Sequence, residues 1–209
     1  MKIKVCGMTD PGNMTAVIQL GIDAIGWIFY PDSERSVMSG ITSLAKVPRG
    51  KVRVVGVFVN EPADVVLEIA HRWNLDAIQL HGDESNDVCR SLAAEIPVIK
   101  TIHVGSAEDM DRCGAYPDAH ALLLETKSAR WGGSGRSFDW SLIRHYHGTQ
   151  PFYLSGGIGP DHLEAIAAID HPQFMGIDIN SRFETAPGLK NTALLKPFVE
   201  ALKSAAHAS

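Results

Sequence analysis

The chain has 209 residues, of which 45% are hydrophobic and 21% are charged, and its formal net charge is −5. This composition supports a sizeable buried core, and the length suits a single α/β domain, so we expect one domain over residues 1–209. The acidic balance and the scattered basic residues argue against nucleic acid as a partner. No apolar run approaches the roughly 18 residues of a membrane span, and no signal-peptide pattern opens the chain. We therefore expect no membrane partner.

The three cysteines, Cys6, Cys89 and Cys113, form neither an even set nor a C-x-x-C pair. Unpaired cysteines are typical of a reducing compartment, which predicts a cytoplasmic location. No two histidines have the H-x-x-x-H spacing of a helical metal site, and we expect no metal.

Short apolar, β-branched runs recur along the chain at intervals of roughly 20–30 residues. Most are continuously apolar rather than alternating, which is typical of strands buried on both faces of a parallel sheet. The eight predicted strands are Ile3–Cys6, Ala24–Phe29, Val52–Val59, Ala77–Leu80, Val98–Ile102, Ala121–Leu124, Phe152–Leu154 and Gly176–Ile179.

Segments with helical periodicity lie between several of these runs. Pro62–Trp73 is one example, with Val66 and Ile69 on one face and Pro62 near the first helical position. Eight strands alternating with helices predict a compact (β/α)₈ barrel, and the alternative is an open flavodoxin-like sheet with an appendage. The other predicted helices are Asn13–Leu20, Asp161–Ile169 and Thr192–Ala205.

Polar or glycine residues follow all eight predicted strands. In a (β/α)₈ barrel these positions meet at one end, where active sites lie, so we expect a site there. Cys6 ends the first strand and is either a small core residue or, with a lowered pKa, a base or nucleophile. Glu125 follows four apolar residues, so a dry setting would raise its pKa toward that of a general acid, whereas on the surface it would only cap a loop.

The seventh strand runs into the glycine turn Ser155–Gly159. Gly156 and Gly157 let backbone N–H groups approach an anion, and Asn180 and Ser181 supply the neighbouring loop, so we expect a phosphate site unless this is an ordinary turn.

Three further polar residues are candidate ligand contacts. Arg35 could bind a substrate carboxylate through a bidentate interaction, or it could be a solvated loop residue. His81 is either a polar residue of the rim or a ligand contact. Asp178 needs a partner if buried, and it would hold a substrate hydroxyl or order the nearby loops. The glycine-rich segment 127–135 is predicted to close over the substrate as a lid.

Several blocks together resemble the phosphoribosylanthranilate isomerase family. They occur in the family's order from residue 3 to about residue 191, nearly the whole chain. The blocks are Lys4–Thr9, Gly56–Asn60, Gln79–Glu84, Gly132–Gly135 with Phe138–Trp140, Ser155–Ile158 and Gly176–Ser181 through Pro187–Gly188.

The resemblance implies a (β/α)₈ barrel that carries out an Amadori rearrangement of N-(5-phosphoribosyl)anthranilate in tryptophan biosynthesis, without cofactor or metal. It implies that Cys6 is the general base and that Arg35 holds the anthranilate carboxylate. The pairs Gly156–Gly157 and Asn180–Ser181 would clamp the phosphate. The family occurs as monomers and homodimers, and this chain is expected to be one of the two.

The chain departs from the family at the general acid, where Glu125 replaces the usual aspartate. The extra methylene changes the reach by about 1 Å, which can cost roughly 100-fold in rate unless the strand end compensates, and we expect compensation. Three other interpretations stay open: an isomerase of the related histidine-pathway ribonucleotide, a non-catalytic barrel that binds a phosphosugar or a partner enzyme, and a structural scaffold.

Overall fold

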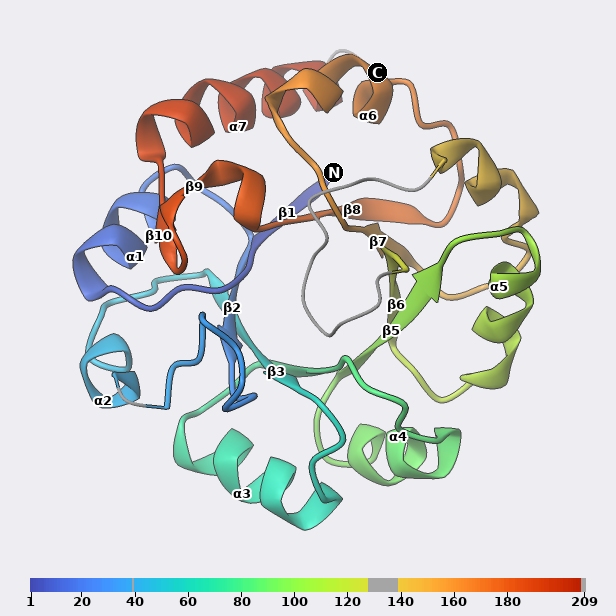
Figure 1. Cartoon of the computed structure of the whole chain (residues 1–209), viewed down its shortest axis with the longest axis horizontal. Helices are drawn as coiled ribbons and strands as arrows, with labels where there is room; N and C mark the ends of the chain where they lie inside the picture. The colour runs from blue at the N-terminus through green and yellow to red at the C-terminus, as the bar shows by residue number, and fades with distance from the viewer. Residues whose placement is uncertain (39, 128–138, 208–209) are drawn as a thin grey trace.

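The computed structural model is a closed barrel of eight parallel strands inside a ring of helices (Figure 1). It describes residues 1–38, 40–127 and 139–207. Each strand pairs with the next in the chain, and β1 closes the barrel against β8 through the register Lys2↔Gly176 to Val5↔Ile179. The barrel prediction is confirmed, and the open sheet is excluded. The strands are β1 Lys2–Val5, β2 Ala24–Ile28, β3 Arg53–Phe58, β4 Ala77–Leu80, β5 Val98–Val104, β6 Ala121–Thr126, β7 Phe152–Leu154 and β8 Phe174–Ile179.

The helices that cover the barrel are of unequal length. The predicted helices near Asn13, Pro62 and Thr192 form with shifted ends, and Pro62 caps its helix instead of opening it. The segment predicted as Asp161–Ile169 is split into a 3₁₀ turn and a short helix. The helices are α1 Pro11–Ile18, α2 Ile41–Leu44, α3 Ala63–Arg72, α4 Asn86–Ala93, α5 Glu108–Asp111, α6 Leu163–Ala167 and α7 Thr192–His207, with 3₁₀ turns η1 Arg112–Ala115, η2 Trp140–His145, η3 Pro160–His162 and η4 Ser181–Phe183.

A small antiparallel hairpin, β9 Glu184–Ala186 and β10 Leu189–Lys190, lies between β8 and α7. Gly188 has a φ of +83° in its turn, a conformation that side chains rarely adopt. The sequence did not predict this hairpin. Within the described ranges, no helix combines the length and apolar character needed to cross a bilayer.

The strands bury two separate apolar clusters. One lies between the strands and the helices, and the other is built from alternate strand residues such as Ala24, Val55, Ala77 and Ala121. Because successive strand side chains point to opposite faces, the second cluster fills the barrel interior. Polar side chains continue this inward set toward the carboxyl ends of the strands, and they build the site. They are Lys4, Gln79, Thr101, Glu125 and Asp178.

Candidate active site

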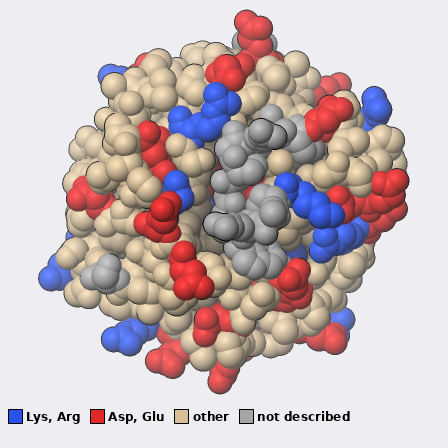
Figure 2. Space-filling view, in the orientation of Figure 1, with Lys and Arg blue, Asp and Glu red and all other residues tan. Residues whose placement is uncertain are grey.

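The carboxyl ends of the strands enclose a pocket of about 530 Å³. Of the residues predicted for the site, Cys6, His81, Glu125, Asp178 and Asn180 line this pocket. Acidic and basic side chains are interspersed around this end of the barrel, with no large area of one sign (Figure 2). The sequence prediction that these side chains meet at one end of the barrel is therefore confirmed.

A buried ion pair lies beside Cys6. Nζ of Lys4 donates to Oδ1 of Asp178 at 2.9 Å, and the Lys4 side chain is wholly buried. Burial raises the pKa of the Cys6 thiol, while the ammonium groups of Lys4 and Lys190 oppose that rise. The strand β2 makes room for the thiol through Gly26, where a Cβ would stand 2.5 Å from Sγ. Lys4 therefore stabilises both the Asp178 carboxylate and any thiolate formed at Cys6.

Glu125 is buried near the end of β6, in contact with two imidazoles. Its Oε2 lies 3.3 Å from Nε2 of His81 and 3.8 Å from Nδ1 of His103. Burial raises the pKa of Glu125 to about 8, and the Asp178 carboxylate adds to the rise. Burial also lowers the pKa of His81 to about 3, so at neutral pH a protonated carboxyl faces a neutral imidazole. Glu125 is therefore suited to be an acid.

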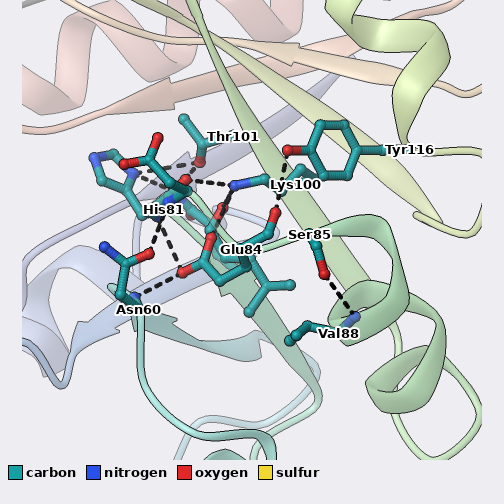
Figure 3. A network of polar contacts seen from close by, with 12 residues as sticks. Asn60, His81, Glu84, Ser85, Val88, Lys100, Thr101 and Tyr116 are labelled. Atoms are coloured by element: carbon teal, nitrogen blue, oxygen red, sulfur yellow. Dashed lines mark hydrogen bonds and ion pairs between the residues drawn. The ribbon is translucent and has the colours of Figure 1, made fainter.

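The loop that carries His81 is anchored by a second buried ion pair (Figure 3). Nζ of Lys100 on β5 donates to Oε2 of Glu84 at 2.8 Å and to the carbonyl oxygen of Gly82 at 2.6 Å. The other oxygen of Glu84 accepts from the backbone N–H groups of Asn60 and Gly82. The loops after β3 and β4 are thus joined to β5, which fixes the position of His81.

A smaller hollow of about 370 Å³ adjoins the pocket and shares Glu125 and Asp178 with it. The loops after β7 and β8 line it through Gly156, Gly157 and Ser181. The two glycines have φ values of +87° and +64°, which bring the bare backbone to the wall of the hollow. Glycine backbone and polar loop ends of this kind suit a phosphate group, as the sequence predicted for this place.

Arg35 also lines the smaller hollow, where its guanidinium is bound by a carboxylate of the chain itself. Its Nη2 donates to Oε2 of Glu184 at 2.6 Å, and its Nε donates to both carboxylate oxygens at 3.0 Å. The same carboxylate accepts from Nζ of Lys190, which also donates to Oδ1 of Asn180 at 2.6 Å. The hairpin β9–β10 thereby links the loop after β2 to the loop after β8.

The comparisons with known proteins agree with this geometry. The family model of N-(5'-phosphoribosyl)anthranilate (PRA) isomerase matches residues 3–201. The chain belongs to the phosphoribosylanthranilate isomerase family. Relatives with this name from Phocaeicola vulgatus and Parabacteroides distasonis are 40% and 41% identical, over 97% and 96% of this chain and 98% and 92% of theirs.

Solved isomerases of this family have the same fold as the chain. The Thermotoga maritima enzyme superposes with a TM-score of 0.87 at 35% identity, covering 98% of this chain and 99% of its own. Another phosphoribosylanthranilate isomerase, solved with reduced 1-(o-carboxyphenylamino)-1-deoxyribulose 5-phosphate, gives 0.86 at 32% identity, covering 98% of this chain and 99% of its own. The family prediction is confirmed, and the chain is an isomerase of tryptophan biosynthesis.

All nine residues predicted for the site line one of the two hollows. Sequence reasoning missed their supporting residues, among them Lys4, Gln79, Glu184 and Lys190. A signal existed for Lys4, because a lysine inside an apolar strand of a barrel is buried on either face of the sheet and needs a buried partner. The predicted lid, segment 127–135, lies outside the described residues from position 128 onward.

Proposed function

We propose that this protein isomerises N-(5'-phosphoribosyl)anthranilate with Glu125 as general acid and Cys6 as general base. The single observation that carries the assignment is one pocket that holds a buried carboxyl, whose pKa is raised, and a thiol next to an ammonium group. The adjoining glycine-lined hollow would take the phosphate, and Arg35 with its Glu184 partner would border the substrate.

In this scheme the Glu125 carboxyl protonates the furanose ring oxygen, and the C1–O bond breaks to give an open-chain Schiff base. The Cys6 thiolate then removes the C2 proton, and the electron pair moves toward nitrogen to form an enolamine. The enolamine tautomerises to the ketone. Lys4 contributes by stabilising the thiolate, which partly opposes the rise that burial causes in the pKa of the thiol.

The glutamate that replaces the family's aspartate has room for its longer side chain, which reaches two histidines beside the pocket. The side chain ends against the imidazoles of His81 and His103, both held by backbone or side-chain contacts. These contacts fix the longer side chain in one place, so the extra methylene need not cost rate. We expect Glu125→Asp to be slower than wild type, because its carboxyl would lie about 1 Å short of both imidazoles.

The first experiment is turnover of phosphoribosylanthranilate, followed by the loss of substrate fluorescence. Glu125→Gln and Cys6→Ala should each lower kcat by about 10²–10⁴-fold, because each removes a proton-transfer group and leaves the binding surface in place. Product-analogue binding by both variants is the control. Binding without turnover by the wild-type protein would overturn the assignment.

We also propose a cytoplasmic location and a monomeric or homodimeric state. The three cysteines are free and buried, as suits a reducing compartment. One solved relative is described as monomers made from a dimeric Thermotoga maritima isomerase, so both states are accessible to this barrel. Sedimentation at several concentrations separates them, and a larger assembly would contradict the proposal.

A further inference from the structure

Three side chains form a compact triangle behind the acid. Nε2 of Gln79 on β4 lies 3.2 Å from Nδ1 of His81 and 3.1 Å from Oγ1 of Thr101 on β5, and that hydroxyl lies 3.3 Å from Nδ1. Figure 3 shows Thr101 facing His81. Gln79 and Thr101 are both 2% exposed, so water competes little for these contacts.

The orientation of the Gln79 amide decides which imidazole nitrogen carries the proton. As placed, its two N–H groups donate to Thr101 and to Nδ1 of His81, and only its Oε1 lacks a partner among the described residues. Turning the amide by 180° would give up both of these donations and take the two N–H groups to the side where Oε1 has no partner. A buried N–H group without an acceptor is rarer and costs more free energy than a buried carbonyl oxygen without a donor. The amide therefore donates to His81, and Nδ1 is an acceptor.

We propose that Gln79 and Thr101 are positioning residues that hold His81 as its Nε2–H tautomer, which donates to Oε2 of Glu125 and leaves the transferable proton on Oε1. A donor at Oε2 favours the proton on Oε1, because the carbonyl oxygen of a carboxylic acid is a better acceptor than its hydroxyl oxygen. After proton transfer the same Nε2–H stabilises the new carboxylate.

The buried setting of His81 and the charges around it keep this donor neutral. Burial opposes a positive charge on His81 most strongly, and His103, Lys100 and Lys4 add to the effect. The groups that act on Glu125 are Asp178, which favours the protonated carboxyl, and Lys4, which favours the carboxylate. Because Nε2 already carries a hydrogen and the lone pair of Nδ1 faces Gln79 and Thr101, the ring offers Glu125 no acceptor, so Glu125 delivers its proton to the substrate.

The tautomer is measured without substrate by long-range ¹H–¹⁵N NMR of the His81 ring. We expect the Nε2–H form at pH 7 in wild type and loss of its dominance in the double variant Gln79→Met/Thr101→Val. An Nδ1–H ring or an imidazolium in wild type would overturn the proposal, as would an unchanged Nε2–H ring in the double variant. The NMR measurement does not depend on turnover, so it can fail or succeed independently of the proposed function. Only the effect on kcat rests on that function.

The kinetic test uses a matched pair at Thr101, which lies behind the pocket wall. Thr101→Val keeps the side-chain shape and removes the hydroxyl, and we expect kcat to fall by roughly 10- to 100-fold with KM within about twofold. Thr101→Ser returns the hydroxyl and should recover most of kcat. A loss in KM alone, or an equal loss in both variants, would contradict a positioning role.

Discussion

Two lysines on the first strand differ in what surrounds their ammonium groups. The side chain of Lys4 is 0% exposed and bound to Asp178, whereas that of Lys2 is 58% exposed and bound to Asp23. Removing one member of a buried pair leaves an uncompensated charge in a dry setting. An exposed ion pair adds little to the free energy of unfolding, because water screens the attraction between its charges.

We therefore predict that Lys4→Met lowers the free energy of unfolding by about 3–5 kcal/mol. The control, Lys2→Met, removes an ion pair of the same chemistry on the same strand and should cost no more than about 1 kcal/mol. Urea unfolding at pH 7 measures both. Similar losses in the two variants would mean that the buried pair does not stabilise the fold in this way.

At the scale of the elements, the loop after β7 depends on backbone that carries no side chain. A Cβ at Gly156 would stand 2.7 Å from the backbone nitrogen of Thr126, and the φ of +87° is itself unfavourable for alanine. Gly50 also has a positive φ, +55°, but nothing lies within 4 Å of its missing Cβ. Alanine at Gly50 would therefore test backbone strain alone, whereas alanine at Gly156 would test strain together with crowding at the site.

We expect Gly156→Ala to raise KM for the phosphorylated substrate by at least about tenfold, since the loop must move away from Thr126 and from the anion. Gly50→Ala should leave KM unchanged and lower stability by only about 1–2 kcal/mol. Steady-state kinetics and thermal unfolding of both variants provide the comparison. An unchanged KM in Gly156→Ala would remove this loop from the phosphate site.

Local sequence predicted the strands better than the connections. Ala77–Leu80 and Phe152–Leu154 have the predicted bounds, because both are short, mostly apolar runs with polar or turn-forming residues on either side, as in a strand buried on both faces. The helix α4 was missed although Ser85 caps it, because its apolar face is short. The partner of Arg35 was out of reach, since Glu184 lies 149 residues away and only barrel closure joins them.

At the scale of the whole molecule, the inward face of the barrel changes from apolar to polar along the strands. Ala24, Ala77 and Ala121 belong to the apolar interior cluster, and Gln79 and Glu125 lie further along β4 and β6 on the same face. The closed sheet excludes water from these polar groups, and this burial is the main reason that the pKa of Glu125 is raised. The arrangement that prepares the acid therefore also couples stability to pH.

His81 makes this coupling measurable. Its pKa is lowered by burial from 6.5 to about 3, so below pH 6.5 the unfolded chain binds a proton that the folded chain does not. The stability contributed by the neutral imidazole is complete above pH 6.5 and is lost as the pH falls toward 3.

The free energy of unfolding should thus fall by roughly 2–3 kcal/mol more between pH 7 and pH 4.5 in wild type than in His81→Gln, at about 1.4 kcal/mol per pH unit. Urea unfolding at the two pH values measures this difference, and His147→Gln, at an exposed position, is the control that should follow wild type. Equal pH dependence in wild type and His81→Gln would show that His81 takes up a proton in the folded protein. The neutral donor that Glu125 requires would then be absent.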